Sequence, residues 1–406
     1  MRFVPLQSLK EGVVLKKSIY DANGNILLED GVELNSFCIR KLKKIKIKSV
    51  YIEDEISKGI EIKSIISDEL RLEAIKNVKE IFKFVEKKHP SQEEVNDSQS
   101  KIKKITENII DEILNNNEVM VNMIDLKVCD DFTFFHSLNV AVLSIAIGYA
   151  MNLRKEELRE LGLAGMLHDI GKVFIPEEVL NKKGRLNDSE FEQIKKHSNM
   201  SFDYLKKRYK LSAKTYRGIL MHHERWDGSG YSKGLSGIDI TLYGRILSVA
   251  DVYDALISDS PYRKVWPPSK ALEYIMAGNG TMFDPKVVEA FIMVVAPYPV
   301  GTVVFLSNYK KGIVLENFEQ KGSRPLIRIF KENEKRVEPY EIDLRDEKFL
   351  SVEIVNIEIW RSQPKSRKRN IYLIISLILV VIGSTFLYIS FILLTLFFIF
   401  NLKINH

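Results

Sequence analysis

The apolar positions of this chain follow different patterns in successive regions, and each pattern predicts a different kind of element. Residues 1–56 contain short, partly alternating runs around the turn signal Asp21-Ala22-Asn23-Gly24, then a Lys-rich helix from about Ser36 and a strand over 49–54. This pattern predicts a small α+β module. Residues 57–118 carry helical apolar spacing on both sides of a polar break over 89–100. They predict a helical linker that either packs against the next domain or forms a homodimer.

Residues 119–297 predict a helical bundle. The run FFHSLNVAVLSIAIGYAM at 134–151 is nearly all apolar, which is typical of a helix buried on all sides. A second helix, over LRELGLAGMLHD, is expected to stop near Gly171 and Pro176. After the bundle, residues 298–360 contain short β-rich runs separated by Gly and Asn, so they predict a small β extension. The fold class is therefore mainly α.

The C-terminal region predicts a membrane anchor. Residues 371–400 contain no charge, and about 20 apolar residues suffice to cross a bilayer. The basic segment 361–370 holds five Lys or Arg against one after residue 400, so the positive-inside rule keeps the preceding domains cytoplasmic. We expect one transmembrane helix in the inner (cytoplasmic) membrane. A hairpin broken at Gly383-Ser384 is the alternative.

Composition narrows the class of protein. A chain with 45% hydrophobic and 28% charged residues is ordinary for a globular protein. Two distant cysteines and no N-terminal signal peptide favour a reducing compartment without disulfides. The net charge of +6 is spread over alternating lysines and acids, which argues against nucleic-acid binding.

Histidines are concentrated in the predicted bundle. Five of the seven lie between positions 136 and 223, whereas a lone histidine on an apolar helix is usually only a core residue. Imidazole and carboxylate are common ligands of zinc, iron and manganese, and one bridging carboxylate would allow two adjacent ions. Intervals of about one helix and its connection place the ligands on successive helices. The candidate ligands are His136, His168, Asp169, His197, His222, His223 and Asp251.

Lys172 follows this cluster closely. It lies three residues after Asp169, on the same face if the helical turn persists. It is expected to contact a substrate phosphate; the alternative is that it caps a helix C-terminus.

Five motifs in order, HSLNVA, HDIGK, KKHS, HHERWDGSGY and ADVYDALISDSPYRK, resemble the HD-GYP family of metal-dependent hydrolases that cleave cyclic di-GMP. The resemblance covers residues 130–291. It implies an HD-superfamily bundle with two divalent ions, iron or manganese. It assigns one ion to His136, His168, Asp169 and Asp251, and the other to Asp169, His197, His222 and His223. Some members hold a third metal through a glutamate one helical turn before the first histidine, where this chain has Phe132.

Two departures from the family pattern concern substrate binding. The chain has Gly230-Tyr231-Ser232 for GYP, and Ser260 in a segment that typically reads DRPYR. Losing the proline should relax the loop, and losing the arginine removes a bidentate phosphate contact. The resemblance leaves Gly230, Tyr231, Arg263 and Lys172 as substrate-binding residues.

These observations predict a membrane-tethered phosphodiesterase that converts cyclic di-GMP to linear pGpG or GMP, with Asp169 and Lys172 as catalytic residues. A diguanylate cyclase is an expected partner. Three alternatives remain: a cyclic di-GMP receptor without turnover, a hydrolase of another cyclic dinucleotide such as cyclic GMP-AMP, and a membrane scaffold.

Overall fold

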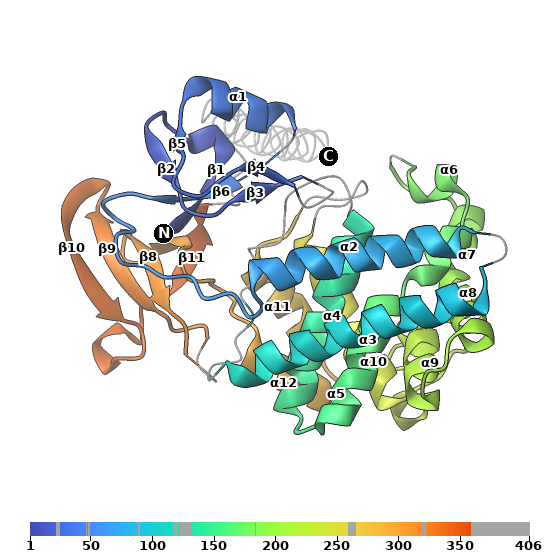
Figure 1. The fold of residues 1–406 in the computed structure, drawn as a ribbon. Coiled ribbons are helices and arrows are strands. Elements are labelled where there is room, and N and C mark those ends of the chain that lie inside the picture. The colour runs from blue at the N-terminus through green and yellow to red at the C-terminus, as the bar shows by residue number, and fades with distance from the viewer. Residues whose placement is uncertain are drawn as a thin grey trace, which may run out of the picture. The chain divides into compact units, whose positions relative to one another are not determined.

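The structure, a computed structural model, describes residues 1–21, 25–45, 47, 49–87, 90–116, 121, 132–182, 184–258, 265–318 and 322–358. The first compact unit of the chain comprises residues 1–359. The predicted class, mainly helical with small sheets, is confirmed for the first unit (Figure 1). The domain boundaries drawn within it stay predictions. The predicted basic segment 361–370 and transmembrane helix 371–400 lie outside the described residues.

The N-terminal module is a small antiparallel sheet covered by one helix. Four strands pair in the order β1-β6-β2-β5, and two more form a separate ladder. The helix α1 (Ser36–Lys44) begins where the side chain of Asn35 accepts a hydrogen bond from the Cys38 backbone N–H. Leu15 and Leu34 are fully buried beneath it. The strands are β1 (Arg2–Pro5), β2 (Val13–Leu15), β3 (Ile19–Tyr20), β4 (Ile26–Leu28), β5 (Glu33–Leu34) and β6 (Ser49–Glu53).

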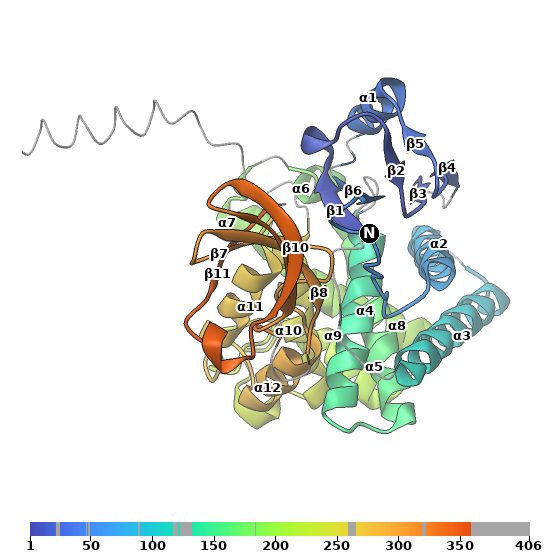
Figure 2. The same cartoon turned by 90° about the vertical axis from the view of Figure 1, so that its left-hand side faces the viewer.

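Two long helices, α2 (Asp68–Val85) and α3 (Gln92–Asn115), follow. They lie side by side (Figure 2), and their apolar faces join the core of the bundle, as the packing interpretation predicted. The predicted polar break over 89–100 is wrong in extent, because residues 92–100 belong to α3. A capping box, in which Ser91 and Glu94 satisfy each other's backbone N–H, starts the helix before its apolar face begins.

The bundle packs around α4. Within the described residues, α4 is the one helix long and apolar enough to cross a membrane, and 72% of that stretch is buried in the protein, as predicted for a core helix. Gly165 lets α5 approach it, because a Cβ there would lie 2.6 Å from the Cα of Ala141. The helices are α4 (Phe132–Ala150), α5 (Lys155–Leu167), α6 (Glu177–Leu180), α7 (Asp188–Lys195), α8 (His197–Arg208), α9 (Ala213–Met221), α10 (Leu242–Ile257), α11 (Pro268–Ala277) and α12 (Pro285–Val294).

The predicted β extension is an antiparallel sheet in the order β10-β9-β8-β7-β11. It contacts the N-terminal module and the start of the linker through backbone and apolar groups. Phe3 N–H donates to the Gly301 carbonyl at 3.3 Å, and Ile60 is buried with Val303 and Ile313. The strands are β7 (Val303–Leu306), β8 (Lys310–Glu316), β9 (Leu326–Glu332), β10 (Lys335–Asp343) and β11 (Ile354–Ile357).

Candidate metal centre

The seven predicted ligands come from five helices and meet inside the bundle. His136 lies in α4, His168 and Asp169 follow α5, His197 begins α8, the pair His222-His223 follows α9, and Asp251 lies in α10. The prediction that successive helices supply them is confirmed, although the short helices α6 and α7 intervene. Six of the seven are buried, and the His223 side chain remains 21% exposed. The centre therefore opens towards solvent at His223.

Three of these histidines are held in the same way. In each, Nδ1 donates to the backbone carbonyl three residues earlier: His168 to Gly165 at 2.8 Å, His197 to Ile194 at 2.6 Å and His222 to Ile219 at 2.5 Å. Because a neutral imidazole carries one proton, each Nε2 is left with a lone pair. The three rings thus direct acceptor nitrogens into a shared space.

His136 is held by a carboxylate instead. Its Nδ1 lies 2.7 Å from Oδ2 of Asp254, whose other oxygen accepts a hydrogen bond from Asn139 Nδ2 at 2.7 Å. The opposite nitrogen, Nε2, lies 3.0 Å from Oδ1 of Asp251. Carboxylates that hold the far nitrogen of a ligand histidine fix its orientation and raise its basicity.

Donor distances around Asp169 and His197 are also short. Oδ1 of Asp169 lies 3.3 Å from His197 Nε2, and its Oδ2 lies 3.4 Å from His168 Nε2. The Nε2 atoms of His222 and His223 lie 3.2 and 3.1 Å from that of His197. Nitrogens this close, with lone pairs facing one another, repel unless a proton or a cation lies between them.

The residues present fit a metal. Three groups of ligand atoms each lie within 4.8 Å of one another: His136-His168-Asp251, His168-Asp169-His222 and His197-His222-His223. In the described part of the chain, His168 Nε2 and Asp169 Oδ1 are buried without a hydrogen-bond partner. Leaving buried polar atoms unpaired is costly, and a cation would satisfy both. Asp169 is within reach of groups on both sides, as a bridging carboxylate must be.

Electrostatics also prepare the donors for a cation. Burial opposes ionisation of Asp169, but His168 and Lys172 hold the pKa of its carboxyl well below the usual range. Burial lowers the pKa of His197 to about 4 and that of His223 to about 3, and it lowers the pKa of His222 as well. At neutral pH these imidazoles are unprotonated and both Asp169 and Asp251 are charged, which is the form that binds metals.

His136 behaves differently because it lies between two carboxylates. Burial disfavours its charged form, yet hydrogen bonds to Asp251 and Asp254 raise its pKa to about 10. In the metal-free protein a proton therefore occupies the position that a cation would take.

Glycine and serine close the packing behind the HDIGK motif. A Cβ on Gly171 would lie 2.1 Å from the His197 carbonyl oxygen, so only glycine allows α8 to approach. Ser201 joins the two segments, accepting from the Gly171 N–H and donating to the His168 carbonyl, each at 2.8 Å. These contacts hold His168 and His197 on facing segments.

The predicted substrate-binding residues border the open side. Lys172 contacts Oδ2 of Asp169 and is 28% exposed, so its cation lies between the buried centre and solvent. The Tyr231 ring lies 4.7 Å from that of His223. Gly230 allows this, because a Cβ there would lie 2.5 Å from the His223 carbonyl oxygen. Arg263 and Ser260 lie outside the described residues, and their roles stay predictions.

The Gly230-Tyr231-Ser232 loop is held by residues that sequence reasoning missed. The buried Glu224 carboxylate accepts hydrogen bonds from the backbone N–H groups of Lys233 at 2.5 Å and Leu235 at 3.1 Å. Ser232 Oγ donates to the Leu220 carbonyl at 3.1 Å, a bond that proline cannot make. The serine therefore has a partner of its own in this loop.

Asp254 and Asn139 were missed as well. Both follow predicted ligands by three residues, Asp254 after Asp251 and Asn139 after His136, so they share a helix face with them. The signal in the sequence was that one charged and one amide residue each lie in an otherwise apolar helix.

Comparison with known proteins identifies the domain. Residues 108–287 match the sequence family described as the HD domain. The chain contains an HD domain. A cyclic di-GMP phosphodiesterase of Pseudomonas aeruginosa is 39% identical over 55% of this chain and 54% of its own length. A cyclic di-GMP phosphodiesterase response regulator of Xanthomonas campestris is 42% identical over 35% and 38%. The resemblance noted from the motifs is confirmed at this level.

Other relatives carry a different substrate in their names. A 3′3′-cGAMP-specific phosphodiesterase of Vibrio cholerae is 41% identical over 38% of this chain and 35% of its own. Among solved structures, an HD-GYP-type protein from Bdellovibrio bacteriovorus covers 71% of this chain and 97% of its own, with a TM-score of 0.46 and 18% identity. The chain spans about half the length, or less, of the first curated relatives it matches.

Proposed function

We propose that this HD domain hydrolyses cyclic di-GMP by means of two divalent ions. The observation that carries this proposal is that imidazole Nε2 atoms converge on two ionised carboxylates, Asp169 and Asp251. The names of the relatives supply the substrate class. Metal binding follows from the HD domain and its donor clusters, whereas the number of ions and their identity are part of the proposal.

The residues divide into two ligand sets that share Asp169. His136, His168 and Asp251 would hold one ion together with Asp169. His197, His222 and His223 would hold the other. Ions held there supply Lewis-acid stabilisation of a phosphodiester and activation of water. Imidazole-rich carboxylate sites suit iron and manganese, which we propose as the native metals.

The remaining residues orient the substrate. Lys172 brings a cation to the rim at Asp169, where it can hold a phosphate oxygen that enters past His223. Tyr231, whose hydroxyl pKa is raised by burial, stays protonated and can donate a hydrogen bond. Glu224 fixes the loop that presents it. The side chains thus bind the dinucleotide at the solvent-exposed side of the centre, and they exclude water from the buried sides of the centre.

Turnover separates the enzyme from a receptor. The protein, reconstituted anaerobically with iron or manganese, should convert cyclic di-GMP to pGpG or GMP, detected by chromatography. Tight binding without product would favour the receptor, an alternative that the serines at 232 and 260 motivate. A panel including 3′3′-cGAMP tests the second candidate function, which the Vibrio cholerae relative supports.

We also propose that the chain is anchored in the inner membrane by one helix over 371–400, on the strength of its thirty uncharged residues. Truncation after Pro364 should move the protein to the soluble fraction with its hydrolysis intact. Retention of the truncated chain in the membrane would contradict this. The homodimer and the cyclase partner stay predictions.

A further inference from the structure

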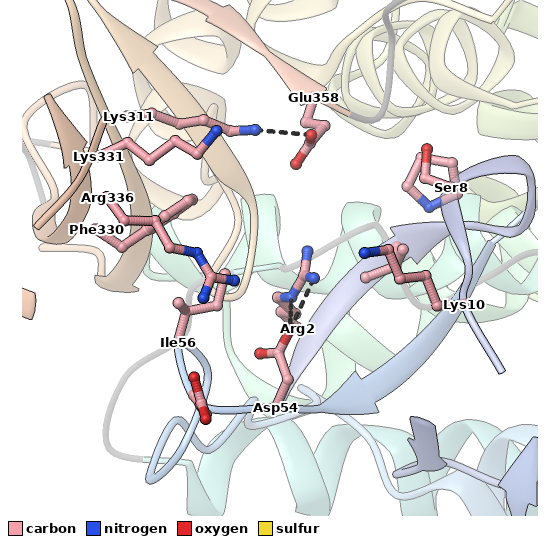
Figure 3. A pocket seen from close by; sticks show the side chains of 13 residues that line it. Arg2, Ser8, Lys10, Asp54, Ile56, Lys311, Phe330, Lys331, Arg336 and Glu358 are labelled. Atoms are coloured by element: carbon pink, nitrogen blue, oxygen red, sulfur yellow. Dashed lines mark hydrogen bonds and ion pairs between the residues drawn. The ribbon is translucent and has the colours of Figure 1, made fainter. Parts of the chain in front are cut away.

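A polar cavity lies where the N-terminal module meets the five-stranded sheet (Figure 3). The residues that line it are far in sequence from the predicted metal ligands. Its volume is about 470 Å³. Strand β1 and the segment after β6 form one wall, and β8 to β11 form the other. Both walls belong to the same compact unit, and Arg328 Nη1 also ties them by donating to the Lys58 carbonyl at 2.8 Å.

Positive charge dominates this cavity. Five lining side chains are cationic and three are acidic. The cationic ones are Arg2, Lys10, Lys311, Lys331 and Arg336. Two of the three carboxylates are already paired: Asp54 with Arg2 at 2.8 Å, and Glu358 with Lys311 at 2.8 Å. The charge that remains facing the cavity is therefore mainly positive.

Lys10 and Arg336 supply that excess. Among the described residues, neither has a carboxylate partner, and Figure 3 shows their charged ends directed towards the hollow from opposite walls. Lys331 lies 3.9 Å from Glu334, which is exposed on the β9–β10 turn. Like charges that converge on a cavity repel, so an anion between them relieves the repulsion.

The cavity also has an apolar side. Val4 and Phe330 are buried, with 3% and 7% of their surface exposed, and the cavity is also lined by Ile56, which packs against the cluster that contains Phe330. A single phosphate would leave most of this volume empty, whereas small-molecule sites typically span about 300–1,000 Å³. Cations on two walls with an apolar side suit a ligand that carries both phosphate and a planar ring.

We propose that this cavity binds a nucleotide, with its phosphates between Lys10 and Arg336 and its base against Val4 and Ile56. None of these residues belongs to the metal centre, so the site is distinct from the catalytic one. Because the ligand would touch both walls, its binding would stabilise the contact between the N-terminal module and the sheet.

GDP binding to the full-length, metal-free protein in detergent tests the proposal by calorimetry. Without metals, the catalytic centre lacks the cations that would hold a phosphate. Arg336→Gln and Lys10→Gln should each weaken binding about tenfold, the effect of losing one charge-assisted hydrogen bond. The matched control is Lys335→Gln, which removes an exposed cation next to Arg336 that does not line the cavity. It should leave binding unchanged.

Three results would overturn the proposal: no GDP binding to the metal-free chain, equal affinity in all three variants, or inorganic phosphate binding as tightly as GDP. Hydrolysis of cyclic di-GMP by the metal-loaded variants is measured in parallel. Loss of GDP binding with normal hydrolysis supports a separate site. GDP binding in a protein that never hydrolyses would contradict the proposed function alone.

Discussion

Asp254 lies 2.7 Å from Nδ1 of His136, while the opposite nitrogen of that ring faces Asp251 at 3.0 Å. The carboxylate is fully buried and also accepts from Asn139. It therefore orients His136, whose Nδ1 is held by a carboxylate and not by the backbone carbonyl three residues earlier that holds His168, His197 and His222.

Replacing Asp254 with Asn should weaken metal binding without removing a ligand. The new amide has only one oxygen, so either Nδ1 of His136 or Nδ2 of Asn139 would face an N–H donor in place of an accepting oxygen. Loss of such a partner typically lowers metal affinity about 10- to 100-fold. Competition with a chelator for Mn²⁺ measures this, and Asp203→Asn on the exposed face of α8 is the control. Equal affinities in the two variants would show that Asp254 has no positioning role.

Replacing Glu224 with Gln should affect substrate binding and spare the metals. The amide can accept from only one of the two backbone N–H groups that Glu224 now satisfies, at Lys233 and Leu235. An unsatisfied buried donor costs about 1–3 kcal/mol, so the loop that carries Tyr231 should lose order. We expect a KM several times higher at unchanged metal content. Asp239→Asn, exposed near the same loop, is the control; a loss of metal would instead assign Glu224 to the centre.

Replacing Asp169 with Asn should abolish hydrolysis and reduce the bound metal to at most one ion per chain. An amide can bind weakly through its oxygen but cannot bridge two cations as a carboxylate does. Elemental analysis and circular dichroism of the same sample check metal and fold together. A folded variant that keeps two ions would refute the bridging role.

Acid should destabilise the metal-free protein. His197 and His223 have folded-state pKa values of about 4 and 3, below the unfolded value near 6.5. As pH falls through 6.5, the unfolded chain takes up protons that the folded protein refuses, so stability is lost between about pH 6.5 and 3. The urea midpoint of the metal-free chain should be lower at pH 5 than at pH 7. Identical midpoints would contradict the burial of neutral imidazoles.

His136 contributes in the opposite sense. Its pKa is raised to about 10, so its stabilisation is complete below pH 6.5 and is lost as pH rises towards 10. The metal-free His136→Gln variant should therefore show a smaller loss of urea midpoint between pH 7 and 9 than the unmodified metal-free chain.

The sequence predicted which side chains lie together inside the bundle, because the HDIGK motif couples His168 and Asp169 to a glycine that packing demands. Gly171 illustrates this, since its missing Cβ admits the His197 carbonyl. The supporting carboxylates were harder to predict. Asp254 acts because the fold buries it against His136, more than a hundred residues away in sequence. Glu224 acts because the fold buries it against the loop that carries Tyr231.

The start of α3, which has few apolar residues, was predicted wrongly. The first turns of α3 contain no apolar stripe, and the periodicity therefore suggested a break. The Ser91–Glu94 capping box carried the correct signal. The cavity between β1 and β9 could not be predicted from periodicity at all, because its walls are contributed by residues near both ends of the described chain.

Titration of Mn²⁺ into the metal-free protein, with cyclic di-GMP hydrolysis followed at each addition, tests the two-ion centre most directly. The ligand sets around Asp169 predict that activity rises until two ions are bound per chain and then stays constant. Full activity with one ion, or hydrolysis by the metal-free chain, would contradict the two-ion centre.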